Sequence, residues 1–311
     1  KRLFENGNYK YTLDQAEAIT NKDGRIPVQL RFVELRLGNM CNLKCRTCNP
    51  ASSVKWRREY ETLMQNLEFV TTYDNSMASY SWPESKKFWS ELLEHRGTLE
   101  TIYINGGEPT LIKRHWDFLR ELIRLDSAKE IKLVYSLNMT VLPSFAVDLW
   151  RKFSKVEIRS SLDDIGARNH YIRHPASWFD IEKNMLQLRH HDWLDIYVLQ
   201  TISAYNFLYL GDLEEWCHEY GFKLTHNYVF EPDFLSPKAL PLSLRLQTLE
   251  KLRTKLPSRL WNPLNSMYGS EEAPTQKPIQ FLKYTQSLDA SRNERFAQAF
   301  PELHALLTDF T

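Results

Sequence analysis

The stretch Cys41-Asn-Leu-Lys-Cys45-Arg-Thr-Cys48 holds three of the four cysteines of the chain, spaced C-x3-C-x2-C. It follows residues 27–37, where apolar and polar residues alternate as in a half-buried β-strand. Gly38-Asn39 ends that alternation. The thiols therefore lie just beyond the carboxyl end of a predicted strand, where α/β folds place their chemistry. This position and spacing predict a thiolate metal site at the edge of a sheet.

Strands and helices alternate along the rest of the first three quarters of the chain. Apolar runs predict further strands over residues 99–104, 131–136, 156–162, 196–202 and 222–230. Helical periodicity fills the intervals, over residues 111–125, 144–153, 179–190 and 208–220. This alternation is typical of βαβ units on a parallel sheet. With the first strand there are six, two fewer than a closed eight-stranded barrel needs.

Three other regions complete the predicted domain organisation. Residues 1–26 form a polar lead-in before the barrel, which spans 27–232. Within it, residues 49–84 mix Ser, Tyr, Trp and charged residues and are predicted to be a helix with an insertion or lid, followed by a helix over 86–95. Residues 233–311 hold seven prolines and helical stretches near 243–255, 279–289 and 292–309, which predicts a helical C-terminal extension.

Composition narrows the possible functions. Hydrophobic residues make up 42% of the 311, a globular composition. The net charge of +1 argues against a nucleic-acid-binding field. No apolar run reaches the roughly 18 residues that cross a membrane. Lys1 to Glu5 lead directly into polar sequence, so we expect no signal peptide and a cytoplasmic location.

The residues alone are compatible with two interpretations of the three clustered cysteines. They would serve as three ligands of a structural zinc site completed by a histidine, of which His95 is nearest along the chain. They would equally bind three irons of a [4Fe–4S] cluster, which ordinarily takes four cysteines. In that case the fourth iron stays open to a substrate or cofactor. The zinc reading describes a non-enzymatic adaptor, and the cluster reading describes an enzyme.

The cysteine stretch resembles the C-x3-C-x2-C loop of the radical S-adenosylmethionine (SAM) superfamily, which follows the first strand of a partial (β/α)6 barrel. Cys41, Cys45 and Cys48 match the three cluster ligands. The resemblance implies one [4Fe–4S] cluster whose open iron chelates SAM, and reductive cleavage of SAM to a 5′-deoxyadenosyl radical that abstracts a substrate hydrogen atom. The family often has an aromatic residue before the third cysteine, where this chain has Thr47.

Two further segments match the family in order. Gly106-Gly107-Glu108-Pro109 ends the second predicted strand, and by the resemblance Gly106, Gly107 and Glu108 hold the amino group of SAM. Residues 135–140, after the third strand, resemble the Thr-Asn-Gly-Thr segment. Ser136 and Asn138 are thereby implied to reach SAM, with Met139 in place of the usual glycine.

A fourth segment resembles the SPASM/twitch branch of the superfamily. Ser161 and Asp163 lie in its Ser-Leu-Asp-Gly equivalent, and Arg173 ends the following His-Asp-x-x-Arg equivalent. The resemblance implies that they contact the carboxylate or ribose of SAM. Topology further suggests that the ends of the fifth and sixth strands line the barrel mouth, with Gln200, Thr201, Ser203 and Asn227.

Enzymes of that branch carry auxiliary clusters bound by several later cysteines, but this chain has only Cys217 after the barrel loop. We therefore expect a single cluster. The branch is rich in peptide-modifying enzymes, which favours a peptide or protein substrate. The alternative is a small molecule such as a sugar or nucleoside. The family also implies flavodoxin or ferredoxin as the electron donor.

Overall fold

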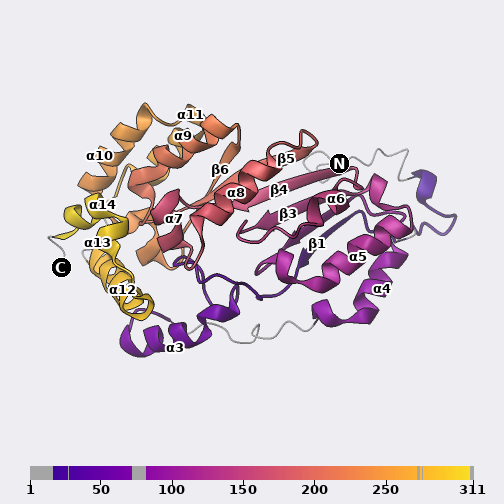
Figure 1. Cartoon of the computed structure of the whole chain (residues 1–311), viewed down its shortest axis with the longest axis horizontal. Coiled ribbons are helices and arrows are strands. Elements are labelled where there is room, and N and C mark those ends of the chain that lie inside the picture. The colour runs from indigo at the N-terminus through magenta and orange to yellow at the C-terminus, as the bar shows by residue number, and fades with distance from the viewer. Residues whose placement is uncertain (1–16, 27, 72–81, 272–273, 275, 309–311) are drawn as a thin grey trace.

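The computed structural model describes residues 17–26, 28–71, 82–271, 274 and 276–308. Most of the predicted lead-in (residues 1–16) and the centre of the predicted insertion (72–81) lie outside the described residues. Six strands form one sheet in the order β1 to β6, and each strand is parallel to its neighbours (Figure 1). The strands are β1 (Phe32–Arg36), β2 (Thr101–Asn105), β3 (Lys132–Leu137), β4 (Lys155–Ser161), β5 (Leu194–Ile202) and β6 (Lys223–Tyr228).

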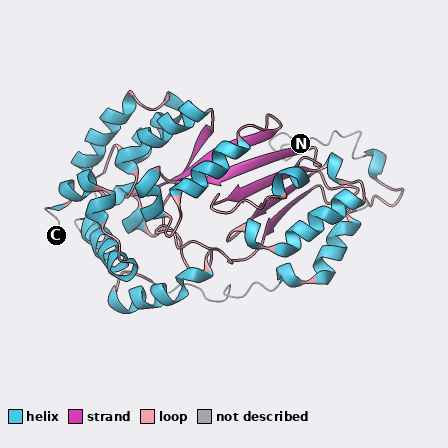
Figure 2. Cartoon of the chain, viewed as in Figure 1, coloured by secondary structure: helices cyan, strands magenta, loops and turns pink. Residues whose placement is uncertain are grey.

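Helices connect successive strands along the chain (Figure 2). They are α3 (Arg57–Asn66), α4 (Lys86–Glu94), α5 (Lys113–Arg124), α6 (Ala146–Trp150), α7 (Gly166–Ile172), α8 (Trp178–Leu188) and α9 (Leu210–Tyr220). Alternate strand residues such as Ile104, Ile158 and Val198 are fully buried. Burying a side chain of this size stabilises the fold by about 1.5–3 kcal/mol. A slip of one residue would turn these side chains to the other face of the sheet, so their burial fixes the strand register.

The sheet does not close into a barrel. Within the described ranges, β1 pairs with β2 and β6 pairs with β5, and the two edge strands do not pair with each other. The inner face is polar: in register across β1 and β2, Glu34 lies opposite Tyr103 and Arg36 opposite Asn105. The predicted α/β fold, a partial (β/α)6 barrel with a mostly helical C-terminal extension, is confirmed.

After β6 the chain is helical wherever the structure describes regular elements. These are α10 (Leu242–Arg253), α11 (Ser258–Tyr268), α12 (Gln276–Arg292), α13 (Phe296–Ala299) and α14 (Pro301–Leu306). Helix α12 lies against α3, to which Arg292 is bound through Glu59 (Figure 1). None of the helices in the described part of the chain is both long and apolar enough to traverse a bilayer.

Several element boundaries differ from the sequence predictions. Strand β1 begins at Phe32, five residues later than the alternation suggested. Helix α11 was not predicted and contains Pro263 inside it. The helix predicted over 292–309 is interrupted, because Phe300 leaves the helical conformation and Pro301 then begins α14. Helix α7 was also not predicted, since its seven residues are too few to show a clear period.

Candidate functional site

A cavity of about 470 Å³ opens at the carboxyl edge of the sheet, and the three clustered cysteines all line it. Its volume falls within the range of about 300–1,000 Å³ that small-molecule sites occupy. Its walls come from the ends of β1, β2, β3, β4 and β6, as parallel strands require. Six of the residues predicted to bind SAM line this cavity: Gly106, Gly107, Ser136, Asn138, Ser161 and Arg173.

The cysteine loop is held from several sides through its own backbone. Lys44 N donates to His174 O at 2.6 Å, and Arg46 N donates to Ile172 O at 2.7 Å. The indole of Trp56 donates to Cys45 O at 3.1 Å, and Ser53 Oγ donates to Leu43 O at 2.6 Å. The loop therefore presents its thiols from a fixed backbone.

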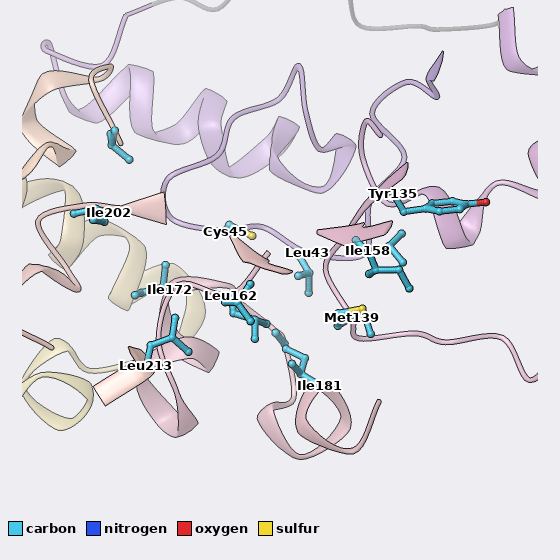
Figure 3. Close-up of a cluster of buried hydrophobic side chains, with 14 of the residues drawn as sticks. Leu43, Cys45, Tyr135, Met139, Ile158, Leu162, Ile172, Ile181, Ile202 and Leu213 are labelled. Carbon is cyan, nitrogen blue, oxygen red and sulfur yellow. The ribbon is translucent and has the colours of Figure 1, made fainter. Parts of the chain in front are cut away.

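Cys45 and Leu43 lie among the buried hydrophobic side chains of the core (Figure 3). Burial raises the pKa of the Cys45 thiol to about 12 and that of Cys48 to about 11. Burial also raises the pKa of Cys41, whose sulfur accepts a hydrogen bond from Leu43 N at 3.4 Å. Buried thiols of this kind become thiolates when a metal replaces their protons.

Gly106 and Gly107 bring the loop after β2 against the cysteine loop. Both have positive φ, +85° and +47°. A Cβ at Gly107 would lie 2.2 Å from Met40 O, and one at Gly106 would lie 2.8 Å from Arg36 Cγ. A side chain at either position would push the two loops apart, so the glycines fix the distance between them.

Glu108 lies behind the cavity wall and does not line the cavity. It is 1% exposed, and its Oε1 accepts from Thr110 Oγ1 at 2.7 Å. Its Oε2 accepts from Asn138 N at 2.7 Å. Burial raises the pKa of this carboxyl, and the hydrogen bonds from Asn138 and Thr110 oppose that rise. The carboxylate thus joins the loop after β2 to the loop after β3.

Asn138 joins the β3 loop to the cysteine stretch. Its amide Nδ2 donates to Asn42 Oδ1 at 2.9 Å and approaches Cys41 Sγ at 3.9 Å. Its Oδ1 accepts from Thr140 Oγ1 at 2.6 Å. The next residue, Met139, has φ of +61°, so the turn keeps the left-handed conformation that the family's glycine would favour.

Arg173 faces the cavity and is held from behind by Asp163, which does not line it. Arg173 Nη1 donates to Asp163 Oδ2 at 2.9 Å, and Thr201 N donates to Asp163 Oδ1 at 3.0 Å. Burial alone would lower the pKa of the guanidinium, but the charges of Cys45 and Asp163 outweigh it and raise the pKa. Its Nε is buried without a hydrogen-bond partner. The site therefore contains a fixed, incompletely satisfied cation.

Of the strand-end residues named from topology, Asn227 lines the cavity. Gln200 Nε2 instead donates to Asp163 O at 3.0 Å, and Ser203 N donates to Asn206 Oδ1 at 2.8 Å. Sequence reasoning also missed some lining residues, namely Glu34, Arg36, Ser52 and Asn105. Glu34 and Arg36 could have been found from the sequence, because they occupy polar positions in the alternating pattern of the first strand.

The cavity offers no obvious fourth soft ligand. Among the described residues that line it there is neither a histidine nor a fourth cysteine. Cys217, the remaining thiol, is buried within α9 and lies outside this lining. Three thiols beside an open volume fit a cluster with one free coordination position better than a closed tetrahedral zinc site.

The sequence matches no family model and no curated protein. Native anSMEcpe with bound AdoMet has a similar structure, with 16% identity over 78% of this chain and a TM-score of 0.51. The same protein with bound AdoMet and Cp18Cys peptide aligns at 15% identity over 79% of this chain and a TM-score of 0.50.

Streptococcus suis SuiB bound to precursor peptide SuiA aligns over 96% of this chain and 59% of its own, at 13% identity and a TM-score of 0.45. This chain spans 63% of the length of anSMEcpe. The sheet, the position of the thiol-lined cavity and the alignment with anSMEcpe agree on the architecture. The chain therefore has the partial-barrel fold of the radical SAM enzymes, which its cysteine stretch led us to expect.

Proposed function

We propose that this chain is a radical SAM enzyme that holds one [4Fe–4S] cluster on Cys41, Cys45 and Cys48. The proposal rests on one observation: the three thiols line a single cavity and have open volume beside them. When bound, the cluster supplies an electron to SAM, which splits into methionine and a 5′-deoxyadenosyl radical that takes a hydrogen atom from the substrate. Flavodoxin or ferredoxin is the electron donor that the proposed family membership suggests.

The protein's own groups divide into those that face SAM and those that position them. Arg173 and Ser161 line the cavity and would bind the SAM carboxylate or ribose, with Arg173 held in place by Asp163. Gly106 and Gly107 expose backbone at the same wall and would receive the amino group. Glu108 and Asn138 fix the loops after β2 and β3 relative to the cysteine stretch.

A peptide or protein is the proposed substrate. A second cavity, of about 230 Å³, also adjoins Cys48 and continues toward the insertion after it. Phe69 and Phe234 form an edge-to-face pair in its wall, with ring centroids 5.1 Å apart. The nearby Tyr284 hydroxyl is already bound to Arg46 O. Such walls suit an apolar side chain, and one similar structure, anSMEcpe, contains a peptide.

The alternative substrate is a small molecule such as a sugar or nucleoside. Its support is the polar inner face of the sheet, where Glu34 and Arg36 line the main cavity.

To distinguish the two substrate classes, peptides, sugars and nucleosides would each be offered in a form labelled with deuterium. Transfer of deuterium into 5′-deoxyadenosine from a labelled peptide, and not from labelled sugars or nucleosides, is the expected result.

The chemistry itself is tested by anaerobic reconstitution with iron and sulfide, reduction, and addition of SAM. The enzyme reading predicts a brown protein that absorbs at about 400 nm and releases 5′-deoxyadenosine. A colourless protein that retains stoichiometric zinc and leaves SAM intact would instead establish the zinc-binding adaptor.

A further inference from the structure

A second group of metal-binding side chains lies outside the thiol-lined cavity. His170, His174 and Glu294 each offer a ligand atom, and these atoms all lie within 4.8 Å of one another. His170 comes from α7, His174 follows that helix, and Glu294 lies in the turn between α12 and α13. We propose that these three residues form a site for a divalent transition-metal ion, best suited to Zn²⁺.

The tautomer of His170 supports the proposal. Its Nδ1 lies 2.6 Å from Ala176 O, and a carbonyl oxygen can only accept, so Nδ1 carries the proton. In the neutral ring Nε2 therefore holds a lone pair, and it points to Glu294 Oε1 at 4.0 Å. In this neutral tautomer Nε2 and Oε1 are both acceptors, so a cation rather than a hydrogen bond would join them. A backbone carbonyl on the far nitrogen is also the usual support of a metal-bound histidine.

The spacing is close to that of a tetrahedral zinc site. Zn–N and Zn–O bonds of about 2.0–2.2 Å place neighbouring ligand atoms about 3.4 Å apart. The two separations from Glu294 Oε1 lie on either side of that value: His170 Nε2 is 4.0 Å away, and His174 Nδ1 is 2.8 Å away, where it donates a hydrogen bond whose proton the metal would replace. The His170 side chain is half exposed, so water can reach a fourth position.

Local charge also favours a cation. Glu294 Oε2 and Asp289 Oδ1 both accept from Arg46 Nη2 at 2.7 Å. Two carboxylates against one guanidinium leave one negative charge beside the two imidazoles. Glu294 N donates to Asp289 O at 3.0 Å, which holds Glu294 in its turn. A metal on Oε1 would therefore fix the carboxylate whose other oxygen holds the cysteine loop through Arg46.

The test uses the whole chain, reconstituted anaerobically so that the cysteines are occupied and then titrated with Zn²⁺ by calorimetry. One equivalent of zinc should bind the parent. His170→Gln should weaken that binding at least about tenfold, while Arg46 and Glu294 keep their contacts. His190→Gln, which changes an exposed histidine just after α8, is the matched control and should bind as the parent does. A parent that binds no zinc, or a His170→Gln variant that binds it equally well, would overturn the proposal.

Two further variants separate this site from the cysteines. The triple variant Cys41→Ala/Cys45→Ala/Cys48→Ala should still bind one zinc, whether or not the proposed SAM chemistry is correct; loss of that zinc would contradict the separate site. His174→Gln repeats the ligand test at the second histidine. Added zinc should raise the melting temperature of the parent and leave those of His170→Gln and His174→Gln unchanged. An equal rise in all three would count against the proposed ligands.

Discussion

Arg46, within the cysteine stretch, donates from Nη2 to Asp289 Oδ1 of α12 at 2.7 Å, across 243 residues of chain. The same nitrogen reaches Glu294 Oε2 at 2.7 Å, and the guanidinium lies 3.5 Å from the ring centroid of Tyr171. The Arg46 side chain is fully buried. The C-terminal extension therefore holds the loop that carries the thiols.

Arg46→Met should destabilise the protein by about 3–5 kcal/mol, because it leaves two carboxylates without their buried cation. We expect a lower melting temperature and less iron per chain after reconstitution. Lys251→Met is the matched control, since the Lys251–Glu302 pair is exposed on both sides and worth less than about 1 kcal/mol. Equal stability of the two variants would show that Arg46 does not hold the loop.

Gly107→Ala should separate the loop after β2 from the cysteine loop. The new methyl group would lie 2.2 Å from Met40 O, at a φ of +47°. The strained backbone alone costs about 1–3 kcal/mol. The expected results are a lower urea midpoint and reduced iron retention. Gly97→Ala is the control, because a Cβ there meets nothing within 4 Å; if both substitutions behave alike, the close approach is not what requires glycine.

Arg173→Lys should weaken SAM binding at least about tenfold while leaving the iron content unchanged. Lysine keeps the charge but lacks the planar donor set that Arg173 shares between Asp163 and the cavity. Equilibrium dialysis of SAM against the reconstituted protein measures the effect. Arg159→Lys, in a partly exposed pair with Glu157, should bind SAM as the parent does. Unchanged affinity in Arg173→Lys would remove Arg173 from the proposed SAM site.

Acid stability should depend on Glu59, which joins α3 to Arg292 of α12. Burial alone would raise the pKa of Glu59, but the hydrogen bonds and charge of Arg292 outweigh it and lower the pKa to about 2. A lowered folded-state pKa contributes stability above the unfolded value of about 4.5, and that stability is lost as the pH falls toward 2.

Glu59→Gln should therefore be less stable than the parent at neutral pH, and the difference should shrink between pH 4.5 and 2. Urea midpoints recorded across this range test the effect. Glu61→Gln alters an exposed residue of the same helix and should follow the parent at every pH. A difference between Glu59→Gln and the parent that stays constant with pH would contradict the assigned pairing.

The fold was predictable because apolar and polar residues alternate before the cysteine stretch and apolar runs mark the later strands. The location of the cavity was also predictable, since the carboxyl ends of parallel strands meet at the same edge of the sheet. Met139 at φ +61° shows why a motif tolerates a substitution: the turn conformation persists although glycine is gone.

The contacts between distant residues could not be predicted. Glu108 was expected to face SAM, but its partners Thr110 and Asn138 depend on how two loops meet. Arg46 is a lone basic residue between two cysteines in the sequence, and its carboxylate partners lie more than 200 residues later, on α12 and in the turn after it. Asp163 was likewise named for SAM, whereas its carboxylate holds Arg173 and Thr201 N.

The central claim concerns Cys41, Cys45 and Cys48, and the most direct test is the amount of 5′-deoxyadenosine formed from SAM by reduced, anaerobically reconstituted protein. The parent and Cys217→Ala should both form it, because Cys217 is buried in α9 away from the cavity. Cys45→Ala should form none above background. If Cys45→Ala cleaves SAM as well as the parent, or if the reconstituted parent holds no iron, the account is wrong.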